Sequence, residues 1–287
     1  MGGFDYGGKM IYSPMMQQYL QTKDEYKDSI LLYRLGDFYE MFFDDAKKAS
    51  EELDLTLTGK DCGMEERAPM CGVPYHAVEG YVAKLIKKGY RVAICEQMED
   101  PKQAKGIVKR EVIKVVTPGT NLNSQALDET KNNYLMSIVY LGDVLGVAIA
   151  DYSTGDFFVT EIETGAELID EINKFVPSEI ILNEYFAMSG IDLTFISEKL
   201  SISVSTLENW YFDDDSCKAK LKEHFHVNTL EGLGIQDYDS GVIASGAMLK
   251  YLYETQKNSL SNILEIRPYS IGKYMICLLY TSDAADD

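Results

Sequence analysis

Residues 35–40 constrain the fold of this chain more than any other stretch. An apolar run precedes this segment, another follows it, and Gly36 and Asp37 lie near its start. Two apolar runs interrupted by Gly-Asp predict a strand, a tight turn and a second strand. Side chains two positions apart in an extended segment share a face, so Phe38 and Glu40 are expected to project together. Tyr39 is then expected to point into the core.

A phenylalanine and a carboxylate on one face suit the recognition of a nucleobase. An aromatic ring can stack on a base or wedge between base steps, and a neighbouring acceptor can bond the base edge. The alternative is that Phe38 is a core residue and Glu40 a solvated strand residue. The tripeptide alone favours this alternative, because phenylalanine in a strand is usually buried.

The composition is that of a soluble globular chain with room for two modest domains. It has 287 residues, 46% of them hydrophobic, and lacks the apolar run of about 18 residues that a membrane helix requires. The first residues carry no signal-peptide pattern. Five cysteines are scattered without Cys-x-x-Cys spacing, which disfavours a zinc site or a disulfide framework and fits a reducing cytosol.

The charge distribution limits where nucleic acid could bind. The formal net charge of −19 argues against such binding, but nearly all of the excess acid follows residue 131. Residues 84–114 contain nine basic residues and four acidic ones. Only the first part of the chain therefore has a local surface suited to phosphates. An ordinary solvated helix face remains the alternative explanation for the basic cluster.

The first part of the chain is predicted to be a mixed α/β sheet with several covering helices. The two prolines around Gly72, in residues 69–74, predict a rigid loop, and the polar residues 59–67 predict another. Helices are expected to start at Ser13-Pro14 and at Asp44-Asp45 and to span 77–88, with further strands over 53–58, 90–96 and 111–116.

The second part is predicted to begin after a polar, turn-rich boundary at 118–133. Strands over 134–140, 144–151 and 156–161 form an antiparallel meander, followed by a helix at 166–175, a strand at 179–183, further apolar segments and a long helix at 240–256. This order of elements resembles a ribonuclease H-like layout, and the resemblance implies that Asp151, at the end of one of these strands, stands where nucleases of that kind hold a metal-binding acid. Two-metal chemistry needs several converging carboxylates, and the sequence shows no second or third ligand, so nuclease activity is disfavoured.

Four segments of the chain resemble the MutS family of DNA mismatch-repair proteins. They are residues 35–46 (LGDFYEMFFDDA), 68–77 (APMCGVPYHA), 92–97 (VAICEQ) and 115–120 (VVTPGT), and the resemblance continues to about Met275. Residues 1–9 are Gly-rich and without pattern, so a flexible tail is expected there. The resemblance implies 10–120 as a mismatch-recognition domain, 121–133 as a linker and 134–257 as a ribonuclease H-like connector domain. Residues 258–275 would begin an α-helical core, and 276–287 look like a non-native tail.

The resemblance implies roles for six residues and none of them is catalytic. Phe38 would wedge into the duplex and stack on a mispaired base, and Glu40 would hydrogen-bond that base. Met70 would pack against the sugar edge or a neighbouring base, and Lys60, Lys109 and Arg110 would contact phosphates. No residue of this chain is assigned to a metal or a cofactor.

The resemblance also implies how a longer protein would work. It would be a dimeric, ATP-dependent mismatch sensor that binds double-stranded DNA with mispairs or small loops. It would engage downstream repair proteins through the connector domain. It would work in the bacterial cytosol, associated with the nucleoid, with no role for membranes. ATP and Mg²⁺ would bind a C-terminal domain that this sequence lacks, because no Gly-x-x-x-x-Gly-Lys-Ser/Thr motif is present. The rival hypothesis is a protein-interaction module that uses an exposed Phe38 and has no DNA role.

Overall fold

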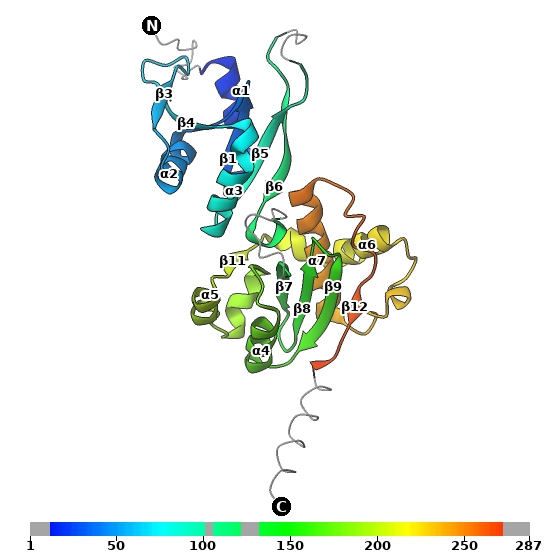
Figure 1. Ribbon diagram of the computed structural model, residues 1–287. Helices are drawn as coiled ribbons and strands as arrows, with labels where there is room; N and C mark the ends of the chain where they lie inside the picture. Colours follow the sequence, from blue (N-terminus) through cyan, green and yellow to red (C-terminus); the bar gives the residue numbers. More distant parts are fainter. Residues whose placement is uncertain (1–11, 101–105, 122–131, 272–287) are drawn as a thin grey trace, which may run out of the picture. The chain divides into compact units, whose positions relative to one another are not determined.

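The computed structural model describes residues 12–100, 106–121 and 132–271, arranged in two compact units (Figure 1). The first unit comprises residues up to 129 together with 255–257, and the second comprises 130–254 with the residues that follow 257. The tail expected at 1–9, most of the linker expected at 121–133 and the non-native tail expected at 276–287 lie outside the described residues. Each unit is described by itself.

The first unit contains a six-stranded mixed sheet in the order β3-β4-β2-β1-β5-β6. Strand β1 pairs in parallel with β5, and the other neighbours pair antiparallel. The mixed α/β sheet predicted for this part is confirmed. The strands are β1 (Ser29–Leu35), β2 (Phe38–Phe42), β3 (Thr58–Lys60), β4 (Ala68–Pro74), β5 (Arg91–Gln97) and β6 (Arg110–Val116), and the helices are α1 (Pro14–Glu25), α2 (Phe43–Leu53) and α3 (Val78–Lys87).

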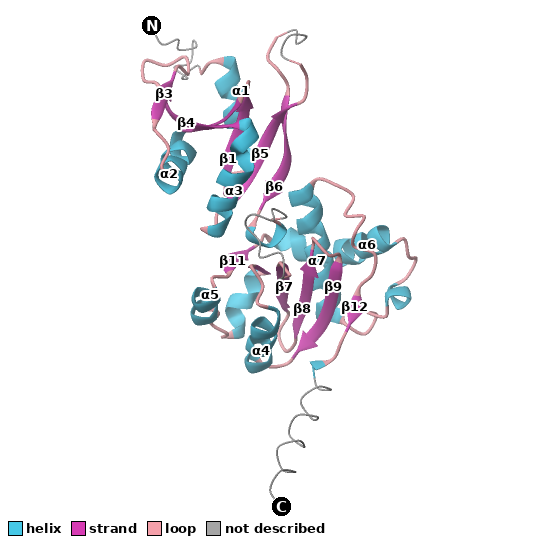
Figure 2. Ribbon diagram, in the orientation of Figure 1, coloured by secondary structure: helices cyan, strands magenta, loops and turns pink. Residues whose placement is uncertain are grey.

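Helices cover both faces of this sheet (Figure 2). Helix α1 packs Met16 and Tyr19 onto the face that carries Tyr33 and Phe42. Helices α2 and α3 cover the opposite face, where Tyr39 is buried with neighbouring apolar side chains. The period-two alternation of β2 therefore places Phe38 and Glu40 on the face of α1, as predicted.

Two segments of the first unit differ from the sequence-based prediction. The strand expected over 53–58 is wrong, because α2 continues to Leu53 and Asp54 follows it with a left-handed φ of 54°. Strand β3 starts only at Thr58. The rigid loop expected at 69–74 is also wrong, because these residues belong to β4, which pairs with both β2 and β3. Its prolines occupy the second and last positions, and the register with β2 runs from Met70 to Pro74, so Pro69 lies outside it.

The second unit contains a six-stranded sheet in the order β11-β10-β7-β8-β9-β12. The predicted antiparallel meander is confirmed for β7, β8 and β9, and β10 and β11 extend the sheet in parallel with β7. The strands are β7 (Tyr134–Tyr140), β8 (Leu145–Asp151), β9 (Asp156–Ile162), β10 (Glu179–Leu182), β11 (Ser203–Thr206) and β12 (Arg267–Pro268), and the helices are α4 (Gly165–Phe175), α5 (Thr194–Leu200), α6 (Asp214–Phe225) and α7 (Asp239–Gln256).

This second sheet is also covered on both faces. Helix α7 packs Val242, Met248 and Leu252 into one apolar cluster, and α4 contributes Leu168 and Ile172 to the cluster on the other face. None of the helices in the described residues is both long enough and apolar enough to cross a lipid bilayer.

The chain after α7 returns to the sheet of the second unit. Strand β12 pairs in parallel with β9, and the Tyr269 N–H donates to the Val159 carbonyl at 3.0 Å. The described residues from 258 to 271 contain no α-helix. The start of a helical core, expected over 258–275, therefore stays a prediction, and its last residues lie outside the described part of the chain.

Candidate nucleic-acid interface

The turn between β1 and β2 exposes one large aromatic side chain. Gly36 adopts a left-handed φ of 58°, and the Tyr75 N–H donates to the Asp37 carbonyl at 2.9 Å, which ties the chain after β4 to the turn. Phe38 is 47% exposed, whereas Tyr39 beside it is buried. An exposed phenylalanine at a tied turn contradicts the interpretation of Phe38 as a core residue.

Glu40 lies on the same face as Phe38 and forms an ion pair across the sheet. Lys60 Nζ is 2.6 Å from Glu40 Oε2, and the two side chains are 31% and 15% exposed respectively. Strand β4 separates the two residues, and its Gly72 stands directly opposite Glu40. A Cβ atom at Gly72 would lie 3.4 Å from Glu40 Cγ, so the glycine leaves room beside the stem of the Glu40 side chain.

Met70 lies on the same face as this ion pair. It stands opposite Phe42 of β2 and Thr58 of β3, and it packs at the border of the cluster that α1 covers. Its half-buried side chain is therefore already supported by the protein. The structure thus places four of the six predicted residues on one face of the neighbouring strands β2, β3 and β4: Phe38, Glu40, Lys60 and Met70.

Lys109 and Arg110 lie elsewhere, at the β6 edge of the sheet. Lys109 is exposed and pairs with Glu111 at 2.6 Å, and its hydrogen bond to Glu111 raises the pKa of its ammonium. Arg110 donates from Nε to the Arg34 carbonyl at 2.8 Å and from Nη1 to Gln18 Oε1 at 3.1 Å. Arg110 is therefore held inside the unit, and Lys109 is the more accessible of the two cations.

Arg34 and Tyr75 flank the turn, and neither was predicted to be a site residue. The Arg34 guanidinium lies 4.1 Å from the centroid of the Tyr75 ring and 3.4 Å from Glu96 Oε1, and its Nε donates to the Gly36 carbonyl at 2.6 Å. Tyr39 donates its hydroxyl proton to the same Glu96 carboxylate, and burial together with that hydrogen bond raises the pKa of Tyr39. This network fixes the base of the turn beneath Phe38. No local sequence pattern signals it, because its members come from three separate segments, at residues 34–39, 75 and 96.

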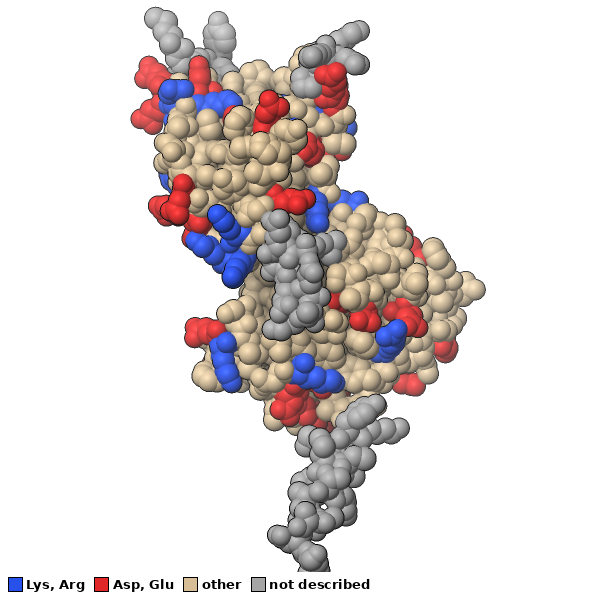
Figure 3. Space-filling model, in the orientation of Figure 1, with Lys and Arg blue, Asp and Glu red and all other residues tan. Residues whose placement is uncertain are grey.

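Charged side chains of both signs share the surface. On the face drawn in Figure 3, the Lys and Arg side chains of the described residues are interspersed with Asp and Glu. Several cations also have acidic partners, such as Lys88, which pairs with Glu52 at 2.5 Å. Any attraction for phosphates on this face therefore depends on individual cations rather than on one broad basic field.

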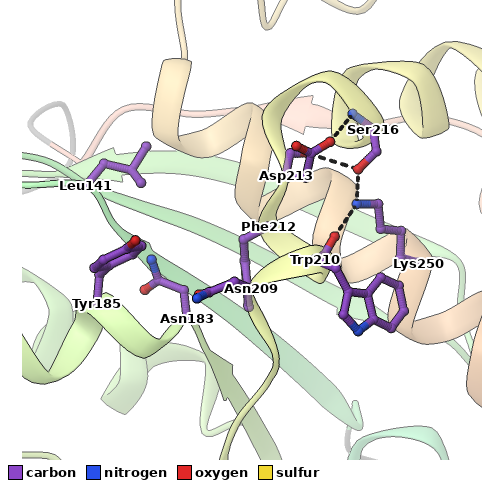
Figure 4. A pocket seen from close by; sticks show the side chains of 9 residues that line it. All are labelled: Leu141, Asn183, Tyr185, Asn209, Trp210, Phe212, Asp213, Ser216 and Lys250. Atoms are coloured by element: carbon purple, nitrogen blue, oxygen red, sulfur yellow. Dashed lines mark hydrogen bonds between the residues drawn. The ribbon is translucent and has the colours of Figure 1, made fainter.

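The second unit has a pocket of about 800 Å³ beside the carboxyl ends of β7, β10 and β11 (Figure 4). Its polar groups mostly bond the protein itself. Lys250 of α7 donates to the Trp210 carbonyl at 3.0 Å, to the Tyr211 carbonyl at 3.1 Å and to the Ser216 hydroxyl. All three protons of this ammonium are engaged, so Lys250 ties the 3₁₀ turn Asn209–Phe212 to α7.

Replacing Lys250→Met should loosen this turn without emptying the core. The substitution keeps an apolar side chain of similar length but removes the ammonium donor from the Trp210 and Tyr211 carbonyls, of which Tyr211 keeps only the weak Cys217 thiol donor, and we expect a cost of about 1–3 kcal/mol. Trp210, the single tryptophan of the chain, sits in the turn and reports the change by fluorescence during urea unfolding. Lys218→Met is the control, because its exposed ion pair with Asp214 should contribute little. Equal effects of the two substitutions would show that Lys250 does not hold the turn.

Asp151, considered above as a metal ligand, is buried at the end of β8. Its carboxylate accepts from the Asn133 N–H at 3.0 Å, from the Ser153 N–H at 2.7 Å and from the Ser153 hydroxyl at 2.5 Å. Within the described residues, no group of three His, Cys, Asp or Glu side chains is placed to hold a metal ion. Asp151 therefore caps the β8–β9 turn.

Comparison with known proteins adds the family context. The family model of MutS domain I matches residues 13–125, and that of MutS domain II matches residues 133–264. Curated relatives named DNA mismatch repair protein MutS include those of Lachnoclostridium phytofermentans, 61% identical over 264 residues, Ruminiclostridium cellulolyticum, 54% over 267, and Acetivibrio thermocellus, 52% over 268. Each alignment covers 92% of this chain but only 28–30% of the relative. The chain thus spans less than a third of the length of these relatives.

Proposed function

The chain belongs to the MutS family, with MutS domain I followed by MutS domain II, and we propose that its first unit recognises mispaired or looped bases in double-stranded DNA. The observation that carries this proposal is the exposure of Phe38. Its side chain is 47% exposed at a turn that a hydrogen bond from Tyr75 to Asp37 holds in place, and the Glu40 carboxylate lies on the same face of the sheet. A half-exposed aromatic ring at such a turn is placed so that it can stack on a base step.

In the proposed mechanism, Phe38 enters the minor groove and stacks on the mispaired base. Inserting a ring between base steps costs a few kcal/mol of stacking, and this cost falls where a mispair has already weakened the stack. Discrimination therefore comes from the deformability of the site rather than from its sequence. Glu40 accepts a hydrogen bond from the mispaired base, and Met70 packs against the sugar edge. Lys109 and Arg110 are assigned to phosphates, with Lys109 the more accessible.

We extend this proposal to a longer protein on the strength of the family alone. Such a protein would dimerise on DNA, bind ATP and Mg²⁺ in a C-terminal ATPase domain, and pass the mismatch signal to downstream repair proteins through the second unit. It would work in the bacterial cytosol, associated with the nucleoid. The two matched domains account for DNA recognition and connection, and the chain itself is proposed to hydrolyse no nucleotide.

The proposal predicts that the chain binds a duplex with one G·T mispair more tightly than the matched G·C duplex. Fluorescence anisotropy at about 50 mM salt, with protein up to about 10⁻⁴ M, covers the range expected for weak non-specific DNA binding. Affinity for both duplexes should fall steeply as salt is raised, because bound phosphates release counterions. Equal affinity for the two duplexes, or affinity insensitive to salt, would favour the protein-interaction module instead.

A further inference from the structure

The ion pair between Lys60 and Glu40 carries an inference that rests on the proposed function and deepens it. We propose that Lys60 is the counter-ion of Glu40 during base recognition, and that it determines which mispaired bases the site accepts. This role differs from a phosphate contact, because the partner of the ammonium is a carboxylate of the protein itself. Three observations support it: the placement of the pair, the free oxygen of Glu40 and the cost of an uncompensated carboxylate near DNA.

The placement of the pair is determined by the sheet. Lys60 Nζ approaches Glu40 Oε2 to 2.6 Å although β4 lies between their strands. Gly72 of β4 stands directly opposite Glu40, and a Cβ atom at that position would lie 3.4 Å from Glu40 Cγ, so β4 places no side chain against the Glu40 stem. The Lys60 ammonium also lies 5.9 Å from the centroid of the Phe42 ring. The lysine is therefore directed along the face of the sheet toward Glu40.

The pair leaves one carboxylate oxygen for a ligand. Lys60 binds Oε2, and within the described part of the chain Glu40 Oε1 accepts no hydrogen bond. An ionised carboxylate is purely an acceptor, so Oε1 can bond only a base that offers an N–H. Paired in this way, the carboxylate selects bases that present a donor and disfavours bases that present an acceptor at the same place.

The charge balance gives the third reason for this role. A carboxylate brought among phosphates meets like charge and loses water, and both effects weaken binding unless the charge is compensated. A cation at 2.6 Å supplies that compensation before DNA arrives. Lys60 then supports binding through Glu40, whereas a phosphate-bound lysine would support binding whatever residue stood at position 40.

A double-mutant cycle in the full 287-residue chain tests the proposal. The variants are Lys60→Met, Glu40→Gln and both together, each titrated with the G·T duplex and with the matched duplex. We expect Lys60→Met to weaken G·T binding about tenfold when Glu40 is present, since removing one partner of a charge pair leaves the other uncompensated. With Glu40→Gln in place, we expect the same substitution to change affinity by about twofold at most. Lys60→Arg keeps the cation and should restore the G·T preference.

The salt dependence separates the two roles of a lysine. A phosphate contact would lower the slope of log affinity against log salt by about one when Lys60 is removed, equally with Glu40 and with Gln at that position. Equal losses in both backgrounds, or such a change of slope, would overturn the counter-ion role alone. Urea unfolding of each variant shows that it is folded before titration. A parent chain without any preference for the G·T duplex would overturn the proposed function and, with it, the recognition role of Lys60.

Discussion

Replacing Phe38→Ala should abolish the preference for the mispaired duplex and leave most of the affinity for matched DNA. The ring is the group that gains from the weakened stacking of a mispair, whereas affinity for matched duplex comes mainly from phosphate contacts. We expect discrimination to fall at least tenfold, which corresponds to about 1.4 kcal/mol of lost stacking. Parallel anisotropy titrations with G·T and G·C duplexes at one salt concentration measure this change.

The chain offers a matched control for this substitution. Leu57 is also 47% exposed and lies in the same unit, between α2 and β3. Leu57→Ala removes a similar exposed apolar surface away from the turn, so it should leave discrimination unchanged. Because Phe38 is half-exposed, its removal should cost little stability, and a thermal melt checks this. A Phe38→Ala chain that still prefers the mispair would show that the ring is not the wedge.

The geometry of this turn could be predicted from sequence because it depends on local rules. The break at Gly36 and Asp37 fixed the turn, and the alternation of β2 fixed which side chains share a face. Phe38 and Glu40 therefore lie as expected, and Tyr39 is buried. The same local rules failed at β4, where prolines and a glycine indicated a loop. The pairing of β4 with β2 and β3 outweighs that local preference.

The ion pair at the site could not be predicted for a related reason. Lys60 and Glu40 are 20 positions apart, and they meet because β4 pairs with the strands of both residues. Register across three strands depends on long-range pairing, which no single-segment pattern contains. Strand β12 shows the same limit in the second unit, where two residues pair with β9 more than a hundred positions earlier.

Gly246→Ala should strongly destabilise the second unit, although alanine is the better helix former. Gly246 lies in α7, and a Cβ atom there would lie 2.3 Å from Cys217 Cβ and 2.5 Å from Cys217 Cα in α6. Cys217 is buried, so neither helix can move aside without disturbing the core. Overpacking of this kind costs about 1–3 kcal/mol, and an overlap with backbone atoms belongs at the upper end of that range. The gain in helix propensity, about 1 kcal/mol, cannot offset it.

Gly80→Ala is the matched control, because the same substitution at this helical glycine should raise the free energy of unfolding. Gly80 lies in α3, and a Cβ atom there would meet nothing within 4 Å, so the substitution should stabilise the first unit by about 1 kcal/mol. Urea unfolding followed by Trp210 fluorescence measures the second unit, and far-UV circular dichroism measures both units, so a transition that changes only by circular dichroism belongs to the first. The same chemical change should thus have opposite signs at two helical glycines. Helix propensity alone predicts that alanine stabilises the protein at both positions. If Gly246→Ala left the free energy of unfolding unchanged, α6 and α7 would pack less closely than these distances indicate.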